Sequence, residues 1–255
     1  MSSASRGAPV VDEASARLRA MLSRPLPEIP PAFFYDDHGS ALFEQITALP
    51  EYYQTRTEIG LLERHAPAML DAARPQRLVE LGSGAGRKIR LLLDAWRPPR
   101  PGATCTMFDV NASFLNASVE RLAADYPAFC FDGIVGDFTR DLDRLGPGGE
   151  RLTIFFGGTI GNLYPAEQHR FFETLASGTA PGDALLIGVD LVKPKARLEA
   201  AYNDARGLTA AFNRRALYGL NARYGGDFEP EAFAHQAFYD EDNAWIEMRL
   251  VARKA

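Results

Sequence analysis

The sequence predicts an α/β protein with a parallel, doubly wound sheet and a second, mainly helical α+β part. Between residues 77 and 192, five apolar segments of strand type alternate with three segments of helical type. This order is typical of a parallel sheet covered by helices on both faces. Helical patterns lie on either side of this region, and two strand-like segments close the chain.

The elements of the central region follow from their hydrophobic patterns and lengths. The expected strands are residues 77–81, 103–110, 129–138, 151–158 and 183–192. The expected helices between them are residues 87–96, 113–126 and 165–177. Such a sheet binds its ligands beyond the carboxyl ends of the strands. Those ends carry the polar residues Glu80, Asp109, Asp137 and Asn162.

The region before the sheet is predicted to be helical. Residues 39–50 place four apolar side chains on one helix face. Thr55 and Glu58 then stand three residues apart in the order of a capping box, so we expect a helix to start at Thr55. Pro67 lies inside this helix and is expected to kink it.

The region after the sheet is predicted to be a long helical segment followed by a hairpin. Residues 194–225 have a helical pattern. Residues 233–240 and 244–254 alternate in polarity and are separated by the turn-like residues 241–243, which predicts two antiparallel strands.

Composition excludes several classes of protein. Apolar residues make up 46% and charged residues 24% of the chain, as in ordinary globular proteins. The net charge of −5 argues against a nucleic-acid or anionic-membrane surface. The sequence has no apolar stretch of membrane length and no signal-peptide pattern, and its four histidines lack ligand spacing. We therefore expect a cytoplasmic protein without a metal site.

The turn after the first strand contains Gly82, Gly84 and Gly86. A phosphate-binding loop of ATPases needs Ser or Thr after its lysine, but Lys88 is followed by Ile89. The spacing G-x-G-x-G also differs from the G-x-G-x-x-G of dinucleotide sites. Glu80 stands two residues before the first glycine, where its charge would disfavour a pyrophosphate and favour a cationic ligand.

Acids at the next two strand ends complete the prediction of a cofactor. Asp109 follows the glycines by about 25 residues, where an acid binds ribose hydroxyls in nucleotide-binding sheets. Asp137 can accept the adenine amino group, and Phe138 can cover the ring. Taken singly, Asp109 could be a helix cap or loop acid, and Phe138 a core residue. Their joint occurrence predicts S-adenosylmethionine as the cofactor and a methyltransferase as the protein.

Longer motifs resemble one particular family. The segments "FFYDDHGSALFEQITALPEYYQTRTE", "LVELGSGAGRK", "GDFTR", "GGTIGNLYPAE" and "AAYNDARGLTAAFNRRAL" together resemble the histidine Nα-methyltransferase family of ergothioneine biosynthesis. The resemblance implies trimethylation of the α-amino group of L-histidine to hercynine. It also implies a Rossmann-like class I methyltransferase domain, residues 59–191, and a discontinuous substrate domain, residues 1–58 and 192–255.

The resemblance also assigns roles to single residues. Substrate-binding positions match Tyr52, Asn162 and Tyr202, and Tyr35 matches a further tyrosine that lines the site. Tyr35 and Asn162 are the residues we expect to act in catalysis, although interdomain packing is the alternative for each tyrosine. The cofactor-binding positions of the family match Gly82, Lys88, Asp109, Asp137 and Phe138.

Family members continue past the residue that matches Ala255 and use that segment to bind the imidazole. We therefore expect the chain to be a fragment or a truncated member with weak or unselective activity toward histidine. Two alternatives remain: a homologue that binds the cofactor without turnover or with another amino acid, and an NAD-dependent oxidoreductase, which the glycine spacing and Glu80 disfavour. No pattern predicts an oligomeric state.

Overall fold

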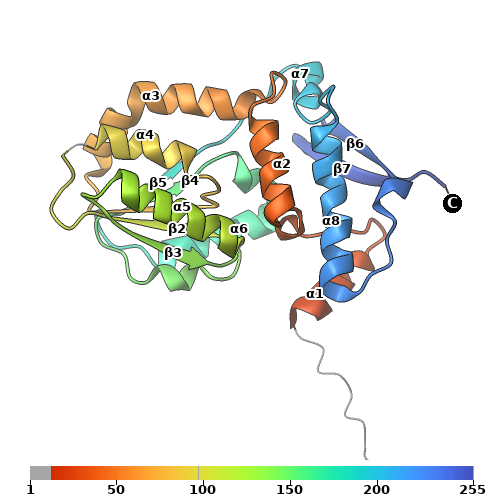
Figure 1. Cartoon of the computed structure of the whole chain (residues 1–255), viewed down its shortest axis with the longest axis horizontal. Coiled ribbons are helices and arrows are strands. Elements are labelled where there is room, and N and C mark those ends of the chain that lie inside the picture. The colour runs from red at the N-terminus through yellow and green to blue at the C-terminus, as the bar shows by residue number, and fades with distance from the viewer. Residues whose placement is uncertain (1–12, 97, 255) are drawn as a thin grey trace, which may run out of the picture.

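The computed structural model describes residues 13–96 and 98–254 and confirms the predicted α/β fold (Figure 1). Five parallel strands form one sheet in the order β3-β2-β1-β4-β5. They are β1 (Arg77–Leu81), β2 (Thr104–Asp109), β3 (Cys130–Val135), β4 (Arg151–Phe155) and β5 (Ala184–Ile187). The strand order reverses between β1 and β4, so the crevice at the end of β1 is the expected ligand site.

Helices cover both faces of the sheet. One face is covered by α3 (Tyr53–Ala73), α4 (Arg87–Ala95) and α5 (Ala112–Asp125). The other face is covered by α6 (Pro165–Ser177) and the short helix η2 (Leu142–Leu145). Side chains alternate along β1: Leu78 packs into the first cluster, and Val79 and Leu81 into the second. Glu80 therefore lies on the face covered by α3 and α4.

The second part of the structure contains most of the remaining helices and the C-terminal hairpin. Its elements are α1 (Glu13–Leu22), η1 (Pro31–Phe34), α2 (Asp37–Thr47), α7 (Lys195–Ala200), α8 (Leu208–Tyr224), η4 (Pro230–Ala232), β6 (Phe233–Asp240) and β7 (Trp245–Ala252). In Figure 1, α2 lies between the sheet and α8, and α8 lies beside the hairpin. An Arg215–Asp36 ion pair and a shared apolar cluster join α8 to the α2 region. Residues 1–12 of the predicted second domain lie outside the described residues.

Some predicted boundaries are wrong. The fifth strand ends at Ile187 instead of residue 192, and the third ends at Val135 instead of residue 138. The predicted helix 194–225 breaks between α7 and α8, where the Asp204 carboxylate accepts the N–H groups of Leu208 and Thr209, the first two residues of α8, at 2.9 and 2.8 Å.

The expected capping box at Thr55 does not form. The helix starts earlier, at Tyr53, so that Thr55 and Glu58 both lie within it, and Thr55 is buried. The helix continues through Pro67 to Ala73. The Glu58 carboxylate is therefore available for partners outside its own helix.

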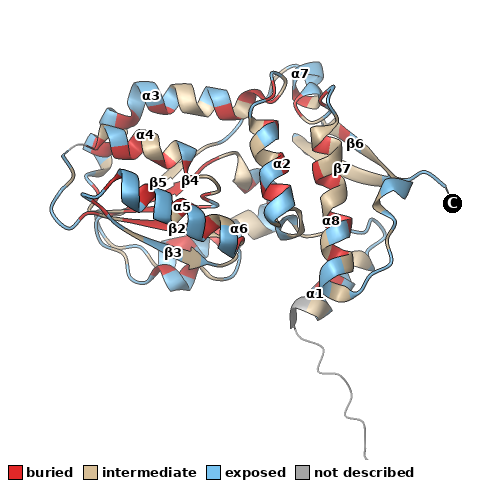
Figure 2. Ribbon diagram, viewed as in Figure 1, coloured by how far each residue is buried: buried red, intermediate tan, exposed pale blue. Residues whose placement is uncertain are grey.

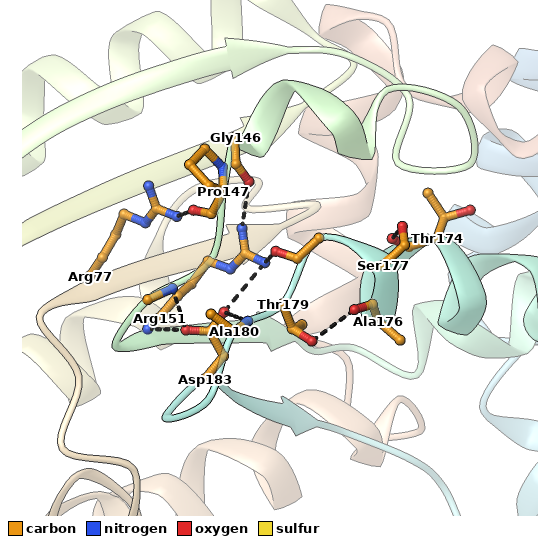
Figure 3. A network of polar contacts seen from close by, with 12 residues as sticks. Arg77, Gly146, Pro147, Arg151, Thr174, Ala176, Ser177, Thr179, Ala180 and Asp183 are labelled. Carbon is orange, nitrogen blue, oxygen red and sulfur yellow. Dashed lines mark hydrogen bonds and ion pairs between the residues drawn. The ribbon is translucent and has the colours of Figure 1, made fainter.

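A buried ion pair between Arg151 and Asp183 lies at the amino ends of β4 and β5, opposite the predicted ligand site (Figure 3). The side chains of Arg151 and Asp183 are 1% and 3% exposed, and their charged atoms lie 3.7 Å apart. The Arg151 guanidinium also donates to the carbonyl of Gly178 at 2.6 Å. The Asp183 carboxylate accepts the N–H of Gly149 at 2.8 Å and of Ala180 at 3.1 Å. Buried residues concentrate in the inner strands β1, β2 and β4 and on the inward faces of the helices, including α2 and α8 (Figure 2).

Candidate active site

No side chain fills the space beside Gly82 and Gly84 in the turn after β1. Gly82, Gly84 and Gly86 have φ angles of +68°, +49° and +67°, a region that favours glycine. A Cβ atom added to Gly82 or Gly84 would meet no atom within 4 Å. The backbone thus leaves open space at the end of β1, as a closely bound cofactor requires.

Asp109, at the end of β2, stabilises this turn by hydrogen bonds. Its carboxylate accepts the N–H of Gly84 at 3.0 Å and the N–H of Asn111 at 3.0 Å. Burial raises the pKa of Asp109, against the opposing effect of these backbone N–H groups. The alternative role of Asp109 as a helix cap does not apply, because Asn111 caps α5 by accepting the N–H of Phe114 at 3.1 Å.

Glu80 is a buried acid without a hydrogen-bond partner on one oxygen. Its side chain lies in the core with the residue only 3% exposed, and Oε2 bonds to no group among the described residues. Burial raises the pKa of Glu80 to about 8; nearby Lys88 lowers it, and Asp109 raises it further. A cationic group beside this carboxyl would satisfy the unpaired oxygen and favour the ionised form. The residues present therefore fit S-adenosylmethionine, which carries a sulfonium and an ammonium.

Lys88 lies in the first turn of α4, directly after the glycine turn. Its ammonium bonds to the Glu58 carboxylate from α3 and lies 5.9 Å from the centre of the Phe156 ring. Both oxygens of Glu58 also accept the N–H of Gly157, at 3.0 Å, just beyond β4. Sequence reasoning missed this role of Glu58, because its spacing from Thr55 suggested a helix cap.

Asp137 and Phe138 lie in the turn that follows β3. The Asp137 carboxylate accepts the N–H and the hydroxyl of Thr139, at 2.9 and 2.7 Å, so it stabilises its own turn. The Phe138 ring packs against Phe155 and Phe171, with centroids 5.0 and 6.1 Å apart. These contacts agree with the packing alternative for Phe138, and the adenine contacts of both residues stay predictions.

The structure brings the three predicted tyrosines into one aromatic group. Tyr52 and Tyr202 have ring centroids 6.0 Å apart. The Phe43 ring lies between the other two, 6.1 Å from Tyr52 and 5.8 Å from Tyr35. Burial raises the pKa of each tyrosine, to about 12 in Tyr202, and Asp109 contributes to the raised pKa of Tyr35. The Asn111 side chain, two residues after Asp109, donates to the backbone carbonyl of Tyr35 at 3.2 Å and so connects the aromatic group with the cofactor side.

Two neighbouring side chains were not predicted from the sequence. The Gln54 amide donates to the Tyr202 hydroxyl at 3.5 Å, and its buried Oε1 has no partner among the described residues. The Tyr53 hydroxyl donates to Asp190 in the segment after β5. No sequence motif distinguishes these residues, since their partners are more than a hundred positions away.

Asn162 is the last residue of the short helix η3 (Thr159–Asn162), which follows β4. Its side chain is exposed and forms no hydrogen bond with the described residues. The structure thus places Asn162 at the expected sheet edge, but no hydrogen bond or ring contact among the described residues joins it to the tyrosines.

Within residues 13–96 and 98–254, no group of three or more His, Cys, Asp or Glu side chains is arranged to hold a metal ion. In the same part of the chain, no helix combines the length and apolar character that a membrane crossing requires.

The strand order, the open glycine turn and the acids at the ends of β1 and β2 define an S-adenosylmethionine-dependent methyltransferase. The profile of one family, described as histidine-specific methyltransferase, SAM-dependent, matches residues 14–255. The chain belongs to this family, and its cofactor is S-adenosylmethionine.

Curated relatives agree with this classification. The chain is 46% identical to the histidine N-alpha-methyltransferase of Mycolicibacterium smegmatis over 93% of its length and 74% of that protein. It is 29% identical to ergothioneine biosynthesis protein 1 of Schizosaccharomyces pombe over 84% of the chain and 29% of that protein. The plantazolicin methyltransferase BpumL in complex with SAH has a TM-score of 0.48 at 13% identity, covering 82% of this chain and 77% of that one.

Proposed function

We propose that the protein transfers three methyl groups from S-adenosylmethionine to the α-amino nitrogen of L-histidine, forming hercynine in ergothioneine biosynthesis. The observation that carries the proposal is the 46% identity to a histidine N-alpha-methyltransferase across 93% of the chain. The aromatic group of Tyr35, Tyr52 and Tyr202 beside the cofactor edge supports it.

The cofactor side of the site is proposed to use residues from three strand ends. S-adenosylmethionine supplies an electrophilic methyl group when it is bound. The open space at Gly82 admits it closely, and Asp109 offers carboxylate oxygens for ribose hydroxyls. Lys88 offers an ammonium for a carboxylate. Asp137 and Phe138 are proposed for the adenine ring.

The substrate side is proposed to use neutral groups. The hydroxyls of Tyr52 and Tyr202, whose pKa values burial raises further above neutral pH, are protonated and can donate to the substrate carboxylate. Asn162 is proposed to orient the α-amino group, with Tyr35 beside it. The aromatic faces can stabilise the increasingly methylated ammonium by cation–π attraction.

The domain division is part of the same proposal. Residues 59–191 would bind the cofactor, and residues 1–58 with 192–255 would form the substrate domain. The aromatic group supports this division, since Tyr35 and Tyr202 come from the two parts of the proposed substrate domain. The acidic net charge of −5 supports a small-molecule substrate without a nucleic-acid partner, and we propose a cytoplasmic location.

The test is mass spectrometry of reactions that contain the protein, S-adenosylmethionine and L-histidine. Mono-, di- and trimethylated histidine should accumulate in order. Histamine, which lacks the carboxylate, should be a poor substrate. Cofactor binding without any methyl transfer to histidine would contradict the proposal and favour the alternative of another amino acid or no turnover.

A further inference from the structure

Glu58 connects three separate parts of the site. It lies in the second turn of α3, whose first residue follows Tyr52. Its carboxylate bonds to Lys88 at the start of α4 and to the N–H of Gly157 at 3.0 Å. The side chains of Glu58 and Lys88 are 14% and 17% exposed, so water screens their interaction only weakly.

The two partners of Glu58 lie on different sides of the proposed site. Lys88 follows the glycine turn and belongs to the cofactor side. Gly157 begins the six-residue segment that ends at Asn162, on the substrate side. The same helix that carries Glu58 begins beside Tyr52. A single carboxylate therefore joins the cofactor turn to the elements that present two of the predicted substrate residues, Tyr52 and Asn162.

Gly188 leaves the space that the Glu58 carboxylate occupies. A Cβ atom added to Gly188 would lie 1.8 Å from Oε1 of Glu58. The φ angle of Gly188 is outside the left-handed region, so its backbone does not itself require glycine. The absent side chain at residue 188 is instead explained by the position of Glu58.

We propose that Glu58 is a positioning residue that couples cofactor binding to substrate binding, an inference that rests on the proposed function. When an anionic group of the cofactor binds Lys88, it competes with Glu58 for the ammonium. The balance between the Lys88 and Gly157 bonds of Glu58 then changes. The segment that carries Asn162 and the start of α3 then change position together. As a result, the side chains that bind the amino acid become better ordered.

The coupling is measured as a ratio of dissociation constants. Calorimetry gives the affinity of L-histidine for the protein alone and with saturating S-adenosylhomocysteine, which cannot donate a methyl group. The wild-type protein should bind L-histidine about tenfold more tightly when S-adenosylhomocysteine is present. Glu58→Gln keeps an acceptor for Gly157 but loses the charge that holds Lys88, and should reduce the ratio to within about twofold of unity.

Two further variants separate coupling from a general loss of structure. Glu63→Gln changes an exposed acid on the same helix and should keep the wild-type ratio. Gly188→Ala keeps Glu58 but displaces its carboxylate, and should reduce the ratio as Glu58→Gln does. If Glu58→Gln does not fold, as judged by circular dichroism, Gly188→Ala gives the deciding ratio.

A wild-type ratio near unity would overturn the proposal. A wild-type ratio that survives in folded Glu58→Gln and Gly188→Ala would overturn it too, while leaving the methyltransferase function intact. Wild-type protein that neither binds nor methylates L-histidine would refute the proposed function, and the role of Glu58 with it.

Discussion

Cofactor binding should release a proton from Glu80. The pKa of this buried carboxyl is raised to about 8, chiefly by burial. At pH 7 it is therefore about nine-tenths protonated in the protein alone. A sulfonium or ammonium bound beside it favours the ionised form, so binding of S-adenosylmethionine at pH 7 should release close to one proton per site.

The same group makes the protein alone less stable as the pH rises. The pKa of Glu80 is about 8 in the folded state, against 4.5 as the ordinary value. Glu80 costs the folded protein no stability below pH 4.5, because its carboxyl is protonated in both the folded and the unfolded state there. Between pH 4.5 and 8 the unfolded state ionises and the folded state does not, so stability is lost as the pH rises. The loss at pH 7 is about 3 kcal/mol, and Glu80→Gln should recover much of it.

Calorimetry in two buffers measures the proton directly. The binding enthalpy of S-adenosylmethionine at pH 7 should differ between phosphate and Tris, because the released proton is taken up by the buffer. The difference should shrink at pH 9, where only about one-tenth of Glu80 is still protonated. Glu80→Gln is the control and should release about one proton fewer than the wild type. Equal enthalpies in the two buffers, or a Glu80→Gln protein that matches the wild type, would refute this account of Glu80.

Three further substitutions test the assignments of other residues. Asp109→Ala should weaken S-adenosylhomocysteine binding by about 1.5–3 kcal/mol for each lost charge-assisted hydrogen bond, and unchanged affinity in calorimetry would remove Asp109 from the cofactor site. Asn162→Ala should raise the KM for L-histidine and leave S-adenosylhomocysteine affinity within about twofold, whereas equal loss of both would indicate a structural loop residue. Asp183→Ala leaves the buried charge of Arg151 unpaired and should cost about 3–5 kcal/mol in urea unfolding. The exposed Asp71→Ala is its control, and a loss of stability below about 1 kcal/mol would contradict the importance of the buried pair.

The strands and helices of the sheet region could be predicted because the hydrophobic pattern of each lies within a few consecutive residues. Each strand of the sheet is a short apolar run beside a helical pattern, and those periodicities are visible in a few residues. The errors occur where a side chain overrides the pattern. Asp204 interrupts the helical region by binding the first N–H groups of α8, and Asp137 turns the chain after β3 by binding Thr139. Neither polar contact can be recognised from hydrophobic periodicity.

The site was predictable to different degrees. The glycines and Asp109 follow from position at strand ends, and the structure joins them by a hydrogen bond of 3.0 Å. The tyrosines required the resemblance to a family, since a single tyrosine gives no signal of its own. Glu58 was misread because its partners, Lys88 and Gly157, are 30 and 99 residues away.

The two sides of the site differ in their titratable groups, and this difference bears on how the proposed reaction can proceed. Acids gather on the cofactor side, where Glu80 and Asp109 surround the glycine turn. The aromatic group on the substrate side carries hydroxyls whose pKa values are raised by burial, to about 12 in Tyr202. Such hydroxyls donate hydrogen bonds but do not accept a proton from an amine at neutral pH. In the proposed function the proton of the α-amino group would therefore leave by a route other than these hydroxyls, such as water, before each transfer. In the proposed function the tyrosines would orient the amine and stabilise its increasing positive charge, roles that need no dedicated base.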